Sequence, residues 1–169
     1  MSNILENKKK GRNFESSIRK VLSQYCYVFK KGVSTPGVDI VAIYSLPNEI
    51  KGVNHISFII EAKISTNYKR ILNSKEILER IKKNFREEII EFLTKTKIFP
   101  LAILIIKEIN KYWFFVYDFE ENLLYRVAVP FKTIKKGIEF FLDLEVFRKL
   151  LQELNQKEKE EFFDLTEVY

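Results

Sequence analysis

Apolar residues recur along this chain with two periods, one typical of helices and the other typical of strands. The apolar stripe that starts at Phe14 and continues through Leu22 has helical spacing and predicts an amphipathic helix from about residue 12 to residue 25. The same spacing predicts a longer helix over residues 75–94 and another over residues 146–154.

Short apolar runs between these helices predict strands. The predicted strands span residues 27–29, 39–44, 56–63, 101–106, 112–117 and 124–129. The run at 101–106 is apolar at every position, which is typical of a strand buried on both faces. Between the strands, residues 30–37 and the polar residues 65–74 predict loops, and residues 45–54 predict a turn or a longer hairpin connection.

This order of helices and strands predicts an α/β fold in which helices pack on a mixed sheet. No glycine- or serine-rich linker and no internal repeat divides the 169 residues, so one domain over residues 1–169 is expected. A hydrophobic content of 46% with 31% charged residues is ordinary for a globular protein and argues against wholesale disorder. The abundance of lysine, glutamate and isoleucine fits either a hyperthermophilic protein or an AT-rich genome.

The chain shows no pattern for a membrane or for secretion. Its apolar runs are shorter than the roughly 18 residues that span a bilayer, and its first ten residues contain no secretion signal. An intracellular protein is therefore expected. The single cysteine, Cys26, excludes an internal disulfide and a multi-cysteine zinc site, and it is expected to act as a small buried hydrophobe. The single histidine, His55, argues against histidine-based catalysis.

The net charge of +6 is concentrated at the N-terminal end. Residues 1–31 hold eight basic and two acidic residues, a balance of +6 that equals the net charge of the whole chain. From Glu139 onward nine acids face four bases, a balance of −5. Such an uneven field favours a polyanion at the basic end, and a nucleic-acid backbone is the commonest one. A solvated basic segment without a ligand is the alternative.

Three charged residues stand at the ends of predicted strands. Asp39 opens one apolar strand, and Glu61 and Lys63 end another. Because residues two apart in a strand share a face, Glu61 and Lys63 should point the same way. Two carboxylates with a lysine favour a Mg²⁺ site that cleaves phosphodiesters. The alternative is a surface pair of Glu61 with Lys63, with Asp39 ending a turn, but the joint occurrence of all three favours the metal site.

The composite of Pro36-Gly37-Val38-Asp39 and Glu61-Ala62-Lys63 resembles the PD-(D/E)xK nuclease superfamily. The stretch from Lys10 to Glu15, followed by an amphipathic helix, is similar to the start of archaeal Holliday-junction resolvases. The resemblance covers residues 8–117, with residues 118–169 as a C-terminal extension of the same domain. It implies a restriction-endonuclease-like mixed central sheet flanked by helices, and a homodimer that resolves four-way DNA junctions with Mg²⁺, for which Mn²⁺ can substitute.

The resemblance also assigns roles to residues. It implies Glu15, Asp39 and Glu61 as metal ligands and catalytic groups, and Lys63 as the catalytic lysine. Ser34 is implied as a serine needed for cleavage, although Thr35 could take its place. The implied DNA-binding residues are Lys8, Lys9, Lys10, Arg12, Lys30 and Lys31.

Two features depart from this family pattern and leave the substrate open. The connection between Asp39 and Glu61 is longer than a tight hairpin, and the family does not require the acidic tail. A different PD-(D/E)xK nuclease, specific for flaps, ends or duplexes, remains an alternative. So do a catalytically inactive junction-binding module and an RNA-processing nuclease.

Two further groups of residues are conspicuous. The run from Trp113 to Phe115 lies in a predicted strand and is expected to serve core or dimer packing rather than base stacking. Lys82, Lys83 and Arg86 are expected on a solvated helix face, with a second DNA contact as the alternative.

The expected location is the cytoplasm, in association with the nucleoid.

Overall fold

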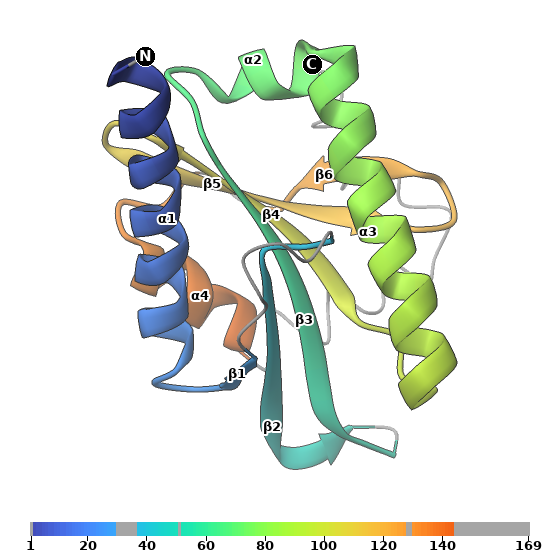
Figure 1. The fold of residues 1–169 in the computed structure, drawn as a ribbon. Coiled ribbons are helices and arrows are strands. Elements are labelled where there is room, and N and C mark those ends of the chain that lie inside the picture. The colour runs from blue at the N-terminus through green and yellow to red at the C-terminus, as the bar shows by residue number, and fades with distance from the viewer. Residues whose placement is uncertain (1, 30–36, 51, 128–129, 144–169) are drawn as a thin grey trace.

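The computed structural model describes residues 2–29, 37–50, 52–127 and 130–143, which form a six-stranded mixed sheet flanked by helices (Figure 1). In chain order the elements are α1 (Ser2–Leu22), β1 (Tyr27–Phe29), β2 (Ile40–Ile50), β3 (Val53–Ile64), α2 (Tyr68–Asn73), α3 (Lys75–Thr96), β4 (Leu101–Glu108), β5 (Lys111–Asp118), β6 (Leu123–Arg126) and α4 (Ile134–Leu142). The predicted α/β class with helices on a mixed sheet is confirmed.

The strands lie in the sheet in the same order as in the chain, from β1 to β6. Every neighbouring pair is antiparallel except β3 and β4, which are parallel. A parallel pair needs a crossover connection, and here α2 and α3 provide it. The central strands β3 and β4 therefore end at the same edge of the sheet, where polar side chains of both can meet.

Each face of the sheet has its own apolar core. On one face α1 and α4 pack against the strands, and on the other face α2 and α3 do so (Figure 1). Alternation along β3 sorts its side chains between the two cores. Phe58 and Ile60 belong to the core under α1 and α4, whereas Ile59 belongs to the core under α3. The continuation of this alternation places Glu61 on the α3 side.

The first helix differs from the prediction at both of its ends. It begins at Ser2 instead of residue 12 and ends at Leu22, so Tyr25 lies beyond it and is 38% exposed. The lysine cluster is therefore helical. Lysine and glutamate are good helix formers, so a polar segment can extend a helix that has no apolar stripe there. Apolar periodicity cannot detect such an extension.

The segments expected to be a hairpin connection and a loop are partly regular. Residues 45–54 belong largely to β2 and β3, whose register shifts between Ser45 and Ile50. The chain reverses at Gly52, where φ is +80°, a conformation that glycine adopts without steric cost. Within the expected loop, α2 forms because the Asn67 side chain accepts a hydrogen bond from the Lys69 N–H.

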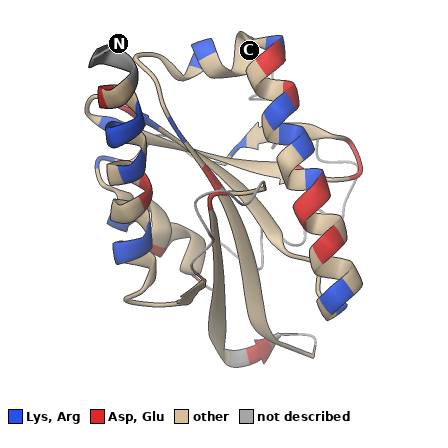
Figure 2. Ribbon diagram, in the orientation of Figure 1, with Lys and Arg blue, Asp and Glu red and all other residues tan. Residues whose placement is uncertain are grey.

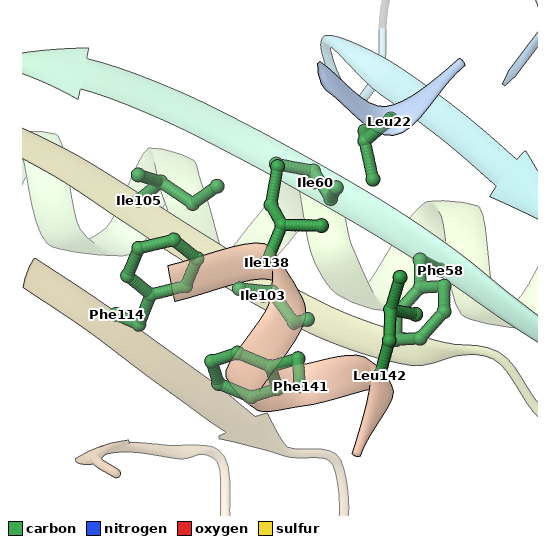
Figure 3. A pocket seen from close by; sticks show the side chains of 9 residues that line it. All are labelled: Leu22, Phe58, Ile60, Ile103, Ile105, Phe114, Ile138, Phe141 and Leu142. Atoms are coloured by element: carbon green, nitrogen blue, oxygen red, sulfur yellow. The ribbon is translucent and has the colours of Figure 1, made fainter. Parts of the chain in front are cut away.

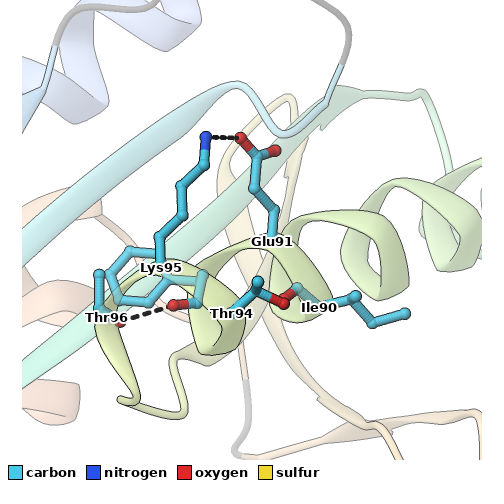
Figure 4. Close-up of polar contacts among 6 residues, drawn as sticks. Ile90, Glu91, Thr94, Lys95 and Thr96 are labelled. Carbon is cyan, nitrogen blue, oxygen red and sulfur yellow. Dashed lines mark hydrogen bonds and ion pairs between the residues drawn. The ribbon is translucent and has the colours of Figure 1, made fainter.

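The C-terminal end of α3 is stabilised by local polar contacts (Figure 4). Lys95 forms an ion pair of 2.7 Å with Glu91, and the Thr94 hydroxyl donates to the Ile90 carbonyl at 2.8 Å. Lys97 then ends the helix in the left-handed conformation, with φ of 62°. These exposed contacts set the length of the helix and do not form a site.

A short helix that was not predicted, α4, covers the α1 face of the sheet beside β5. It leaves a small pocket lined only by apolar side chains (Figure 3). They come from Leu22, Phe58, Ile60, Ile103, Ile105, Phe114, Ile138, Phe141 and Leu142. Because no polar group enters this pocket, it is a packing feature and not a substrate site.

The predicted C-terminal elements are described only in part. The strand expected over residues 124–129 is found as β6 over Leu123–Arg126, while residues 128–129 lie outside the described part. The helix expected over residues 146–154 also lies outside it. Among the described residues, no helix combines the length and the apolar character needed to cross a bilayer.

Candidate active site

The candidate site lies where β2 and β3 separate. Their antiparallel pairing places Ile40 opposite Ile60, and the Asp39 N–H donates to the Ile60 carbonyl at 3.1 Å. Just before this point Gly37 has a φ of 126°, which favours glycine. Along the edge of β3 that faces β2, the next N–H belongs to Ala62. It donates to Asp39 Oδ2 at 2.8 Å, so the carboxylate replaces the strand partner at this position.

Glu61 is held between the sheet and α3. Its side chain is only 1% exposed, and Asn84 of α3 donates from Nδ2 to Glu61 Oε1 at 3.2 Å. Burial of a carboxylate in an apolar core is costly unless the group is neutralised or paired. Asp39 on the neighbouring strand lies close enough to Glu61 to raise the pKa of its carboxyl group.

Helix α1 brings Glu15 and Arg19 to the same place. Glu15 also lies close enough to Asp39 for that residue to raise its pKa. One turn later, Arg19 donates from Nη2 to the Asp39 carbonyl at 2.8 Å. Lys63 lies close enough to both glutamates to affect their ionisation. The structure therefore brings together Glu15, Asp39, Glu61 and Lys63, which lie in three separate segments of the sequence.

The electrostatics of the site reflect this crowding of carboxylates. Burial, followed by the charge of Asp39, raises the pKa of Glu61 to about 8, while Lys63 and the Asn84 hydrogen bond oppose the rise. Burial and the Asp39 charge also raise the pKa of Glu15, whereas Arg19 and Lys63 lower it. At neutral pH and without a bound cation, Glu61 is therefore mostly protonated.

The donor set consists of carboxylate oxygens, which are the ligands that Mg²⁺ and Mn²⁺ take. Asp39 is the common neighbour of Glu15 and Glu61, so the three carboxylates are held together pairwise. In the described part of the chain, no three Asp, Glu, His or Cys side chains already surround one point as metal ligands. The residue types fit a hard cation, and their side chains would have to move to bind it.

The predicted DNA-binding residues fall into two groups. Lys8, Lys9, Lys10 and Arg12 lie exposed on α1, which carries many of the basic side chains of the protein (Figure 2). Lys30, Lys31, Ser34 and the alternative Thr35 lie outside the described residues.

The other conspicuous residues have packing roles. Residues 113–115 are buried in β5, which confirms the prediction of core packing. Cys26 is half-buried beside the core, and burial raises the pKa of its thiol to about 11. The expected solvated face of α3 is wrong for Arg86, because Arg86 donates to the Phe119 carbonyl at 2.8 Å. Lys83 is exposed and pairs with Glu87 at 3.9 Å, as a solvated residue would.

Sequence reasoning missed two residues of the site, Arg19 and Asn84. Arg19 follows Glu15 by four positions and therefore lies on the same side of α1. This spacing is visible in the sequence. Asn84 interrupts the apolar stripe of α3 beside Ile81 and Phe85, and a polar residue in such a stripe often has a buried partner.

The fold and the site thus define a mixed α/β protein with a cluster of carboxylates and a lysine at the fork of two central strands. No protein-family model matches the chain, and neither the curated proteins nor the solved structures include a match.

Proposed function

We propose that this protein is a metal-dependent DNA endonuclease of the PD-(D/E)xK type, with a restriction-endonuclease-like fold, that resolves four-way DNA junctions as a homodimer. The observation that carries the proposal is the convergence of Glu15, Asp39, Glu61 and Lys63 at the separation of β2 and β3. A chance surface pair of Glu61 and Lys63 would not bury Glu61 beside a second carboxylate.

The chemistry follows from the side chains present. Asp39, Glu61 and Glu15 would hold the cation, which supplies Lewis-acid polarisation of the phosphate when bound. Lys63 places a positive charge beside these carboxylates, where it can orient water and stabilise the charge that develops on phosphorus. Hydrolysis adds water across one P–O bond and releases a hydroxyl end and a phosphate end. Asn84 fixes one Glu61 oxygen and so limits the rotation of that carboxylate.

A basic path leads along α1 to this site. Residues on a helix are separated by about 100° each, so Lys8, Arg12, Glu15 and Arg19 fall on one side of α1. Glu15 and Arg19 reach Asp39, so Lys8 and Arg12 extend the same side away from the carboxylates. A phosphate backbone lying along this side would enter the site. Lys10 points to a different side of the helix.

The proposed homodimer would suit a junction as substrate. A four-way junction has approximate two-fold symmetry, and a two-fold dimer places one site on each of two opposing strands. Two paired nicks then release two duplexes. The proposed location, in the cytoplasm with the nucleoid, follows from this substrate.

The first experiment compares cleavage of a four-way junction, a flap and a linear duplex in the presence of Mg²⁺ or Mn²⁺. We expect the junction to be cut much faster than the other two substrates. Similar rates on all three would point to another nuclease of the same type, and faster cutting of an all-ribose substrate would point to RNA.

The second experiment uses Asp39→Asn, which keeps the size of the side chain and removes its charge. Junction cleavage should fall by a factor of about 100 or more, because one preorganised charge of a catalytic site contributes that much. Junction binding should persist. If the wild-type protein binds junctions without cutting them in either metal, it is a binding module and the enzymatic proposal is wrong.

A further inference from the structure

Trp113, the single tryptophan of the chain, carries a buried indole N–H that meets no hydrogen-bond acceptor among the described residues. Its side chain is 7% exposed, and its ring lies 4.2 Å from the ring of Tyr68, centroid to centroid. A buried donor without a partner costs roughly 1–3 kcal/mol, so native proteins seldom leave one without a reason. One such reason is a ligand that supplies the acceptor.

Two cations lie beside the same ring. The Cζ of Arg126 is 5.2 Å from the ring centroid, and the Nζ of Lys111 is 5.7 Å from it. The Nε of Arg126 is a second buried donor without an acceptor. In the part of the chain that the structure describes, neither cation forms an ion pair with a carboxylate.

The nearest acid by sheet register already accepts a hydrogen bond from the main chain. Glu108 stands opposite Lys111, but Glu108 Oε2 accepts the Tyr68 N–H at 2.7 Å. Two cations and an unpaired indole N–H therefore share one place on the sheet. An anion that accepts several hydrogen bonds would satisfy these donors.

This cluster lies on the same face of the sheet as the candidate active site. Lys63 pairs with Ile106 in the register of β3 and β4, and Ile106 pairs with Trp113 in the register of β4 and β5. Two strand spacings separate Lys63 from Trp113, a distance of about 10 Å. A DNA strand advances by at least about 3.4 Å per nucleotide, so it covers this distance in about three nucleotides or fewer.

We propose that Lys111, Trp113 and Arg126 form a phosphate-binding subsite for the DNA backbone, within about three nucleotides of the bond that is cut. This inference rests on the proposed function, because it takes the substrate of the active site as its ligand. A phosphodiester carries a negative charge that can pair with the two cations. Its oxygens can accept hydrogen bonds from Trp113 Nε1 and Arg126 Nε. Backbone contacts of this kind position a substrate and do not read its sequence.

The single indole makes the test direct. In a ¹⁵N-labelled full-length protein, one indole N–H resonance belongs to Trp113. Titration with a short single-stranded deoxyoligonucleotide, without divalent metal, should shift this resonance in a saturable manner. Inorganic phosphate at high concentration should shift it in the same direction. Arg126→Met should abolish the shift. If that variant does not fold, Lys111→Met provides the test: it changes an exposed residue and should weaken the shift several-fold.

Control variants separate the subsite from a general loss of charge. Lys136→Met removes one positive charge from an exposed position of α4, on the other face of the sheet, and should leave the indole shift unchanged. Trp113→Phe keeps an aromatic ring but removes the N–H, so the protein should fold as before and bind the oligonucleotide several-fold more weakly. An effect of Lys136→Met equal to that of Arg126→Met would overturn the proposal.

The remaining outcomes show which phosphate group binds, and they separate a failure of the subsite from a failure of the proposed nuclease function. Equal shifts with and without a 5′-phosphate on the oligonucleotide support a backbone contact, whereas a shift seen only with the 5′-phosphate overturns it. An unmoved indole resonance in a protein that cleaves junctions overturns the subsite alone. A shifted resonance in a protein that cleaves nothing supports the subsite and removes the nuclease.

Discussion

The main-chain N–H of Ala62 donates a 2.8 Å hydrogen bond to Asp39 Oδ2. This bond joins Asp39 to the strand that carries Glu61 and Lys63. Since the strand partner of Ala62 is missing where β2 begins, the Asp39 carboxylate satisfies a backbone donor that would otherwise be unpaired. Asp39 therefore has a structural role in addition to its proposed role in metal binding, and the two roles can be separated.

Replacement of Asp39 by asparagine or by alanine separates them. Asparagine keeps an oxygen that can accept the Ala62 N–H, whereas alanine removes it. We expect Asp39→Ala to lower the free energy of unfolding by about 1–2 kcal/mol more than Asp39→Asn does. Urea unfolding of both variants without divalent metal measures this difference. Equal stability of the two variants would show that the hydrogen bond contributes nothing to folding.

Glu61 should make stability depend on pH. Its pKa is about 8 in the folded protein, above the ordinary value of 4.5 expected when the chain is unfolded. Between these values the folded state binds a proton that the unfolded state has lost, so stability falls as pH rises from about 4.5 to about 8. Glu61→Gln removes this dependence and should stabilise the metal-free protein at pH 8.5 by about 1–3 kcal/mol, with little effect at pH 4.5.

Thermal unfolding at the two pH values, in the presence of a chelator, measures this effect. Glu76→Gln is the matched control, because the Glu76 side chain is 83% exposed and its pair with Arg80 should contribute little. The same Tm difference between wild type and Glu61→Gln at both pH values would contradict the buried, protonated state of Glu61.

A divalent cation should compete with this proton. Carboxylate ligands must be ionised to bind metal, so the apparent affinity for Mn²⁺ should rise between pH 6 and pH 8. Mn²⁺ should raise the Tm of the wild-type protein and should have a much smaller effect on Asp39→Asn. Calorimetry in two buffers of different ionisation enthalpy would detect the released proton. A pH-independent affinity would mean that Glu61 is not a ligand.

Basic residues of α1 should contribute to junction affinity according to the side of the helix on which they lie. Lys8→Ala with Arg12→Ala removes two positive charges from the side of α1 that carries Glu15, whereas Lys10→Ala with Lys20→Ala removes two from other sides. The logarithm of junction affinity falls with the logarithm of salt concentration by about 0.9 per phosphate contact, so the first double variant should lose nearly 2 from this slope. The second should change it little. Equal slopes for both would assign the affinity to overall charge.

Two glycines in helices should respond oppositely to alanine. A Cβ at Gly137 of α4 would clash with the Phe114 ring, so Gly137→Ala should destabilise the protein by about 1–3 kcal/mol. A Cβ at Gly11 of α1 meets nothing within 4 Å, and alanine there should stabilise the helix by up to about 1 kcal/mol. Chemical unfolding of both variants measures the difference. A destabilised Gly11→Ala would contradict the helical extension of α1.

The candidate site was predictable from sequence to a large extent. Asp39 before an apolar run, and Glu61 with Lys63 at the end of another, have residue types and spacing that indicate their chemistry. Arg19 and Asn84 were not predicted, because their importance depends on which partner each one meets. The Asp39 carbonyl that Arg19 contacts is 20 positions away, and Glu61 is 23 positions from Asn84.

The secondary structure was likewise predictable in part. Strands with strong apolar character, such as β4, were predicted close to their observed bounds. The N-terminal extension of α1 and the pairing of residues 45–50 were missed, because no apolar pattern marks a solvated helix turn or an irregular hairpin. In these segments local propensity and strand pairing determine the structure.

The sequence by itself determined the α/β class, the alternation that puts Glu61 and Lys63 on one face of a strand, and the charge imbalance between the two ends of the chain. Only the tertiary structure decided that this face meets Asp39, Glu15 and Asn84. The physical reason is range: alternation and helical period act over a few residues, whereas the register between β2 and β3 and the packing of α1 and α3 are set by burying whole apolar faces.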